Sequence, residues 1–207
     1  MSLRFDIRVG LGVVAICGTL NGCCGGDDDD GDTTTTFFVT SDTRGNGDLG
    51  GLDGADQRCN DLAKGAKLKG HVFHAYLSTS GVNANRRIGD RKWQNKHGDV
   101  IAESLAALHD GSLVGSPTKF VTEKGNPVPS EEHAILTGSM PDGTVKADKT
   151  CGDWASTTGK GQVGHSDGEG PNMNTNPPFN SWNSAAEVNC ADMKNGGSGR
   201  IYCFASD

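Results

Sequence analysis

The sequence predicts an α+β domain in which one or two helices pack on a small, irregular and mostly antiparallel sheet with long loops. Three observations favour this fold class: one clear amphipathic helix, several short strands rich in aromatic and β-branched residues, and 31 glycines among 207 residues. So many glycines indicate turns and loops and disfavour a helical bundle. The length suffices for one domain of ordinary size with appendages.

The first half of the domain contains its clearest elements. We expect FFVTS at 37–41 to form the first strand and VFHAYL at 72–77, which alternates, to form the second. Between them, a glycine-rich turn at 44–51 leads into a helix through GADQRCNDLAKGAKL. Apolar residues at helical spacing define its buried face: Leu52, Ala55, Cys59, Leu62, Ala63 and Ala66.

The second half is less regular. A short helix is expected at 101–109, and a loop-like segment with short extended pieces follows at 110–132. A further strand is expected at 134–137, before the Pro-Asp-Gly turn at 141–143.

The last third combines one long loop with one strand. Residues 159–179 are rich in glycine, asparagine and proline and offer almost nothing to bury, so we expect a long surface loop. RIYCF at 200–204 is expected to form the final strand. No internal repeat is present, so a single domain over residues 37–207 is predicted.

The N-terminus predicts export. Arg4 and Arg8 precede an apolar stretch at 9–20 of signal-peptide length, which is too short to span a bilayer comfortably. It ends in Leu-Asn-Gly-Cys, which resembles the lipobox of bacterial lipoproteins with Cys23 as the lipidated residue. Residues 1–22 are therefore predicted to be a lipoprotein signal peptide, and an ordinary signal peptide cut nearby is the alternative.

The segment at 23–36 is expected to be a flexible acidic stalk. It combines Asp27 to Asp30 with a run of threonines and contains no apolar side chain to bury after its cysteines. Several acyl chains on Cys23 would anchor the protein without a spanning helix. An outer-membrane location is expected because Cys24, and not an aspartate resembling a retention signal, follows Cys23. Surface exposure and a periplasmic orientation both remain open.

Four cysteines remain for the domain, and they predict two disulfides. They are Cys59, Cys151, Cys190 and Cys203. An exported chain meets an oxidising compartment, and four cysteines allow three pairings. No cysteine or histidine cluster has the spacing of a structural zinc site.

Several segments, taken in order, resemble one known family. FFVTSDTRGNGDLGGLDGADQRCNDLAKGAKLKGHVFHAYLSTS at 37–80 resembles the opening of the endostatin domain of collagens, with its GADxxC helix and FxAxLS strand. GSMPDG at 138–143 matches the GSxPxG turn, and CGDW at 151–154 matches CxxW. Asn189-Cys190 and Ile201-Tyr202-Cys203 match the closing cysteine pair, so the resemblance covers Phe37 to Phe204.

The lipobox, the acidic stalk and this domain together are similar to the endostatin-like outer-membrane lipoproteins of leptospires. The resemblance implies a C-type-lectin-like fold, in which Cys59 pairs with Cys203 and Cys151 pairs with Cys190. It also implies adhesion to matrix proteins such as laminin and fibronectin, and to complement regulators. Zinc binding by collagen-derived endostatin does not carry over, because the matching stalk contains no histidine.

A basic cluster is the candidate ligand-binding site. It consists of Arg86, Arg87, Arg91, Lys92, Lys96 and His97 around Trp93. Basic groups beside an exposed aromatic ring can hold sulfated glycans or acidic protein surfaces. A solvated loop with a buried Trp93 is the alternative.

A calcium site is the weaker candidate. Hard oxygen ligands gather in one segment: Asp167, Glu169, Asn172, Asn174 and Asn176. The sugar-binding lectins of this fold carry a Glu-Pro-Asn or Gln-Pro-Asp triplet, which is missing here, and Trp182-Asn183-Ser184 lacks the last carboxylate of their Trp-Asn-Asp strand. A polar surface loop is therefore favoured over a calcium site.

Composition narrows the function classes further. A net charge of −7 disfavours nucleic-acid binding. No HExxH segment occurs and no arrangement of nucleophile and base is evident, so we expect neither an enzyme nor a cofactor. The predicted function is lipid-anchored, adhesin-like binding of extracellular macromolecules, either matrix proteins or sulfated glycans. A calcium-dependent lectin and a structural envelope lipoprotein are the alternatives.

Overall fold

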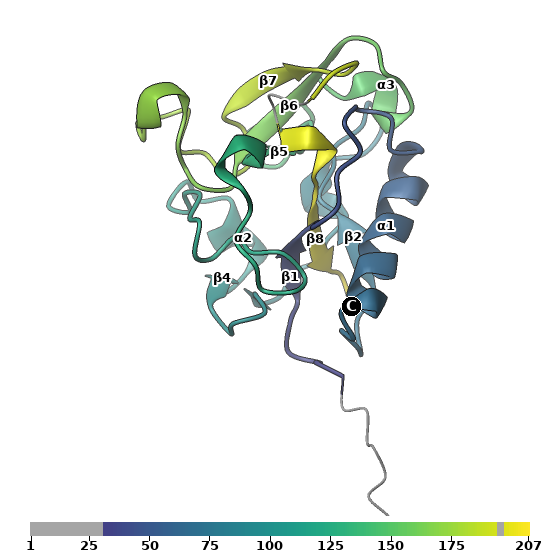
Figure 1. Cartoon of the computed structure of the whole chain (residues 1–207), viewed down its shortest axis with the longest axis vertical. Coiled ribbons are helices and arrows are strands. Elements are labelled where there is room, and N and C mark those ends of the chain that lie inside the picture. Colours follow the sequence, from purple (N-terminus) through teal and green to yellow (C-terminus); the bar gives the residue numbers. More distant parts are fainter. Residues whose placement is uncertain (1–30, 194–196) are drawn as a thin grey trace, which may run out of the picture. The chain divides into compact units, whose positions relative to one another are not determined.

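The computed structural model describes residues 31–193 and 197–207, and Gly31–Asp207 form one unit (Figure 1). The predicted signal peptide, the lipobox at Cys23 and most of the acidic stalk lie outside these residues. Within them the chain is α+β, with few helices and mostly antiparallel sheets, as the sequence predicts.

The central sheet joins the two ends of the domain. β8 (Tyr202–Ala205) lies between β1 (Phe37–Val39) and β2 (Phe73–Ala75), and both pairings are antiparallel. These strands confirm the predictions at 37–41, 72–77 and 200–204. The last strand of the chain is therefore the middle strand of its most buried sheet.

α1 (Gly51–Gly65) confirms the predicted helix and packs beside this sheet (Figure 1). Ala55, Cys59 and Ala63 form its buried stripe, as the helical spacing predicts. Cys59 bonds to Cys203 in β8 across 144 residues of sequence. This disulfide ties the helix to the central strand.

A second sheet has the order β5-β6-β7 and is antiparallel throughout. Its strands are β5 (Ala134–Leu136), β6 (Lys160–His165) and β7 (Ala186–Asn189). β3 (Trp93–Gln94) and β4 (Val100–Ala102) form a small hairpin. Short helices complete the domain: α2 (Leu105–Leu108), α3 (Cys151–Trp154), η1 (Ala84–Arg86), η2 (Ser130–Glu132), η3 (Pro171–Met173) and η4 (Gly197–Gly199).

Two apolar clusters form the core. Because side chains alternate along a strand, Phe38 joins the cluster with α1, while Phe37 joins a second, aromatic cluster. The second cluster includes Tyr76, Trp182 and Phe204, whose rings contact one another. The central sheet is therefore covered on both faces.

The prediction of one long surface loop at 159–179 is wrong in its first part, where β6 is the middle strand of its sheet. Its glycines permit close packing. A Cβ at Gly164 would lie 1.6 Å from the Trp182 carbonyl oxygen, and one at Gly161 would lie 3.0 Å from Cys151 Sγ. The glycine-rich composition of β6 therefore suggested a loop, although its glycines make room for neighbouring residues around a buried strand.

The predicted helix at 101–109 is also partly wrong. Ile101 belongs to β4, and helical structure begins only at Leu105. Ser104 separates the two elements, because its side chain accepts a hydrogen bond from Ala107 N and caps α2.

The last residues of the predicted stalk, 31–36, belong to the domain. Thr35 and Thr36 are buried, and Asp32 forms a β-bridge with Leu68. The Asp32 carboxylate accepts hydrogen bonds from Thr34 and Thr35, and Lys96 pairs with it at 2.9 Å. These contacts fix the segment, so the expectation of a solvated tether is wrong for these residues.

Candidate functional site

α3 is a left-handed turn at one end of the domain. All four of its residues have positive φ: Cys151 49°, Gly152 60°, Asp153 56° and Trp154 66°. This conformation costs about 1–2 kcal/mol for each residue that has a Cβ. Such a turn persists only where its surroundings fix it, and strain of this kind concentrates at functional sites.

Specific contacts hold the turn in place. Trp154 is buried and its indole N–H donates to the Ser78 carbonyl at 2.8 Å. The Asp153 carboxylate accepts hydrogen bonds from the N–H and hydroxyl of Ser80 at 2.8 and 2.6 Å, and from the Thr150 hydroxyl at 3.0 Å. The Ser80 hydrogen bonds lower the pKa of Asp153, so it is ionised at neutral pH.

The second disulfide closes the same region. Cys151, the first residue of α3, bonds to Cys190 directly after β7. Both disulfides therefore have the pairing that the family resemblance implies. This bond fixes the left-handed turn against the β5-β6-β7 sheet.

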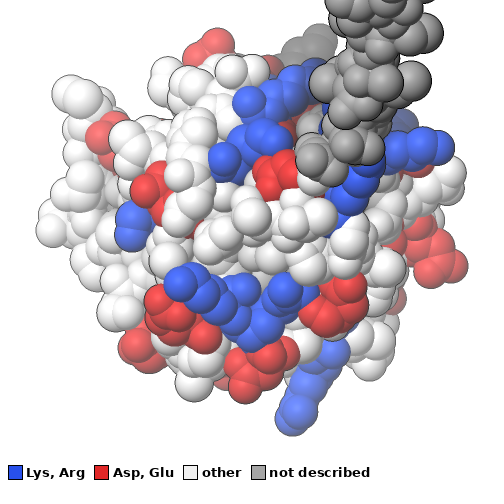
Figure 2. Space-filling model, turned by 90° about the horizontal axis from the view of Figure 1, so that it is seen from below, with Lys and Arg blue, Asp and Glu red and all other residues white. Residues whose placement is uncertain are grey.

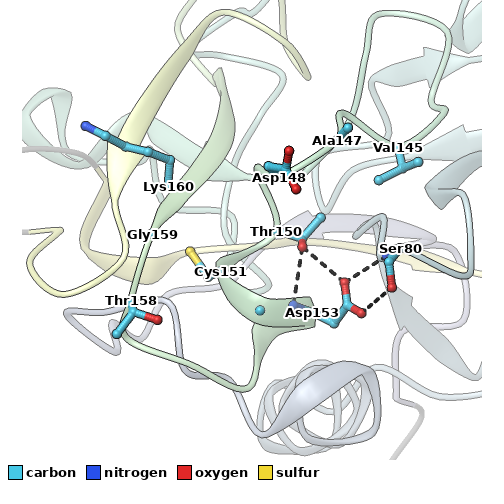
Figure 3. A pocket seen from close by; sticks show the side chains of 11 residues that line it. Ser80, Val145, Ala147, Asp148, Thr150, Cys151, Asp153, Thr158, Gly159 and Lys160 are labelled. Atoms are coloured by element: carbon cyan, nitrogen blue, oxygen red, sulfur yellow. Dashed lines mark hydrogen bonds between the residues drawn. The ribbon is translucent and has the colours of Figure 1, made fainter.

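A pocket of about 500 Å³ opens beside this turn (Figure 3). Its walls combine apolar groups with hydroxyls and the hydrogen-bonded Asp153 carboxylate, and two exposed charged side chains stand at its rim. The lining includes Val145, Ala147, Cys151, Thr150, Thr158 and Ser80. At the rim, Asp148 and Lys160 are exposed, and neither forms an ion pair with another described residue. The pocket can therefore offer one acceptor and one donor charge to a ligand.

This pocket lies at the opposite end of the domain from the point where the chain enters. Leu49 N donates to the Trp154 carbonyl at 2.8 Å, which places α3 at the start of α1. Asp32 bridges Leu68, just beyond the end of α1. The 15 residues of α1 span about 22 Å, so roughly the length of this helix separates the two ends (Figure 1).

The predicted basic cluster lies near the chain entry, and its aromatic residue is buried. Trp93 is 0% exposed, its indole N–H donates to the Ala205 carbonyl at 3.0 Å, and its ring contacts Phe204 edge-on. The interpretation of Trp93 as an exposed binding residue is therefore wrong. It is a core residue, because β3 packs its face against the end of β8.

Most charges of this cluster are neutralised by carboxylates. The ion pairs are Arg87–Asp56 at 2.6 Å, Arg91–Asp207 at 3.4 Å, Lys92–Glu103 at 3.5 Å and Lys96–Asp32 at 2.9 Å. Among the residues that the structure places, only Arg86 of the five cations has no ion pair. Figure 2 shows Lys and Arg interleaved with Asp and Glu at this end. The cluster is thus no continuous basic patch.

The weak calcium candidates do not converge. Asp167 Oδ2 lies 2.5 Å from His133 Nδ1, and its other oxygen accepts the Glu169 N–H at 2.9 Å. Asn174 instead accepts a hydrogen bond from Asn176 N. Within residues 31–193 and 197–207, no group of three or more His, Cys, Asp or Glu side chains is arranged to hold a metal ion.

Trp182 and Asn183 occupy the core. Asn183 is 2% exposed, and its amide donates to the Tyr76 hydroxyl at 3.1 Å and to the carbonyls of Met140 and Pro141. The Tyr76 hydroxyl in turn lies 2.7 Å from His109 Nε2. The Asn183 side chain therefore connects buried elements and has no free oxygen directed at a surface ligand.

Sequence reasoning missed the pocket residues at the α3 end. Left-handed φ values at residues other than glycine and asparagine have no sequence signal, and Ser80, Asp148 and Lys160 come from three separate segments. The nearest available signal was the Cys-Gly-Asp-Trp segment itself, which carried only a cysteine and a resemblance.

No protein-family model matches the chain, and a search of curated proteins finds no matching relative. In the described part of the chain, no helix has the length and apolar character needed to cross a bilayer.

Proposed function

We propose that the protein is a lipid-anchored, adhesin-like binding protein of the outer membrane, with an endostatin-like domain of the C-type-lectin-like fold. Its ligands are extracellular macromolecules, namely matrix proteins or sulfated glycans. The lipidated residue is Cys23, and residues 24–30 link it to the domain. The resemblance at 37–204 supports this proposal, together with the arrangement of both disulfides.

The proposal depends on the chain entry and the pocket lying at opposite ends of the domain. The chain enters beside the end of α1, and the pocket beside α3 lies at its start, about 22 Å away. An anchored domain with this polarity presents its pocket away from the attachment point. That orientation suits a protein that contacts molecules outside the cell.

The binding surface belongs at the α3 end. Four of the five cations of the basic cluster are paired, and exposed ion pairs give little free charge to a partner. At the α3 end, Asp148 and Lys160 are unpaired within the described chain and flank a pocket. We therefore place the ligand contact at the pocket and not at the basic cluster.

Binding of the mature, oxidised protein to laminin, fibronectin, collagen and heparin tests the function. Each partner is measured with calcium, with chelator and across salt concentration. We expect saturable binding that does not depend on calcium. Binding that disappears with chelator would favour the lectin alternative, and absence of binding to every partner would contradict the proposal.

Two charge-neutral variants locate the contact. Asp148→Ala with Lys160→Ala removes one charge of each sign at the pocket, and Lys92→Ser with Glu103→Ser does the same at the entry end. We expect only the first to weaken binding. Equal effects would indicate that neither end is the specific site.

The anchor has its own test. Cys23→Ser should abolish incorporation of labelled fatty acid and release the protein from the membrane fraction, whereas Cys24→Ser should leave both unchanged. Retention of the Cys23→Ser protein in the membrane would contradict lipid anchoring at this residue.

A further inference from the structure

One edge of the β5-β6-β7 sheet is open. β7 pairs only with β6 in the described part of the chain. Gln162 in β6 donates its N–H to the Lys149 carbonyl and accepts from Thr137 N, so its main chain points away from β7. Gln162 lies opposite Glu187. In an antiparallel pair, the main chain of Glu187 then points away from β6 as well.

The main chain of Asn189, two residues after Glu187, points outward by the same alternation. Cys190 N donates to the Gly159 carbonyl at 3.2 Å, so the N–H of Cys190 faces β6, while its carbonyl accepts from Gly47 N at 2.8 Å. Asn189, one residue earlier, therefore also directs its N–H and carbonyl away from the sheet. The edge presents four main-chain groups in the spacing of a strand, which is a template on which another extended backbone can pair.

A pocket with apolar side chains, and with His133, His165 and Glu187 in its lining, lies beside this edge. It has a volume of about 300 Å³, and its lining includes Val163, Ala186, Val188, Phe179 and Pro171. Ala186 and Val188 belong to β7 and face the core side of the sheet. In a sheet, laterally adjacent residues project to the same face. A residue added opposite Ala186 or Val188 would therefore direct its side chain toward this pocket.

The other face of the edge carries positive charge. Lys146 and Lys149 share the Glu187 carboxylate at 3.5 and 2.8 Å, and Lys160 of β6 lies opposite Asn189 of β7. With Asp148 nearby, three ammonium groups face two carboxylates. A second copy paired at this edge would bring like charges together, whereas an acidic segment would complement them.

We propose that β7 is the docking edge for an extended segment of a partner protein, which adds as a strand beside Glu187 and Asn189. The segment places an apolar side chain in the pocket of Ala186 and Val188. On the alternate positions it carries an acidic residue toward Lys160, which has no ion pair with another described residue. The docking edge is a second contact surface, which shares Lys160 with the pocket beside α3, and the inference defines its partner as a protein.

A proline substitution that removes one outward N–H group of β7 tests the docking edge. Peptides selected from a random 12-residue phage library on the oxidised protein serve as probes. Glu187→Pro removes the outward N–H and leaves the hydrogen bonds to β6 in place, whereas Glu187→Ala removes the side chain alone. We expect at least tenfold weaker peptide binding for Glu187→Pro and no loss of binding for Glu187→Ala, because the alanine variant frees Lys146 and Lys149 to attract an acidic segment.

Amide hydrogen exchange of the unsubstituted protein gives a second, independent measurement. Bound peptide should slow exchange at Glu187 and Asn189, because both N–H groups gain acceptors. Exchange that is unchanged at these residues, equal binding by the Glu187→Pro variant, or recovery of no peptide would overturn the proposal. Dimers that Glu187→Pro dissociates would show a second copy as the occupant and would also overturn it.

These outcomes remain distinct from those of the proposed function. If matrix proteins bind the Glu187→Pro variant as well as the unsubstituted protein, strand addition fails and the binding function stands. If peptides bind by strand addition but no matrix protein or heparin binds, the docking edge stands and the adhesin-like function fails.

Discussion

Arg87 donates to the Asp56 carboxylate at 2.6 Å, joining the loop before β3 to α1. The other Asp56 oxygen accepts the Ala75 N–H at 2.8 Å, so one carboxylate connects the loop, the helix and β2. A residue that the sequence suggested for ligand binding therefore stabilises the fold.

Adjacent arginines give a matched test of that role. Arg87→Ser should lower the free energy of unfolding by about 2–4 kcal/mol, because it leaves the mostly buried Asp56 carboxylate without its cation. Arg86→Ser should change it by about 0.5 kcal/mol or less, since Arg86 is exposed. Urea denaturation measures both, and equal losses would contradict the assignment.

Trp93 provides a test of core packing. Trp93→Ala should destabilise the protein by about 3–5 kcal/mol, because it removes a fully buried ring that contacts Phe204. Trp93→Phe should recover much of this loss while still lacking the hydrogen bond to Ala205. A Trp93→Ala variant as stable as the parent protein would show that the ring is exposed.

Removal of the Cys151–Cys190 disulfide should affect stability and the pocket together. The double variant Cys151→Ser with Cys190→Ser is expected to lose about 2–4 kcal/mol. Because Cys151 begins the left-handed turn, amide exchange at Asp153 and Trp154 should accelerate more than exchange in the central sheet. Uniform acceleration throughout the domain would indicate that the bond does not fix this turn specifically.

His109 predicts a pH dependence of stability. Burial lowers its pKa from the ordinary value of 6.5, so the unfolded chain binds a proton more readily than the folded protein. Its contribution to stability is present above pH 6.5 and is lost as the pH falls through the folded pKa. Burial lowers the pKa of His165 in the same direction.

Replacement of His109 tests this pH dependence of stability. His109→Gln should flatten, without abolishing, the loss of stability between pH 7 and pH 5, because His165 still titrates. Urea midpoints at the two pH values give the change. An identical change in the parent and the variant would show that His109 does not contribute.

The elements that the sequence predicted correctly are those with a clear local pattern of apolar residues. α1 and the central strands have strong apolar periodicity, and tertiary packing agrees with it. β6 was missed because Gly161 and Gly164 resemble turn residues, although they make room for Cys151 and Trp182. Composition cannot distinguish a glycine that bends the chain from one that admits a neighbour.

The candidate site depended on contacts that are distant in sequence. Lys96 meets Asp32 across 64 residues, and Arg87 meets Asp56 across 31. A cluster of cations read along the chain therefore says little about the free charge that remains after folding. The pocket at α3 was equally hidden, because its left-handed turn follows from tertiary constraints.

Blocking each end of the domain with one bulky side chain tests the central claim most directly. Thr158→Trp fills the pocket beside α3, and Lys92→Trp places the same side chain on the exposed surface near the chain entry. Affinity for whichever matrix protein or glycan the parent binds is then measured on the full-length, oxidised protein. We predict at least a tenfold loss for Thr158→Trp and little change for Lys92→Trp. The reverse result would place the binding surface at the entry end and contradict the account.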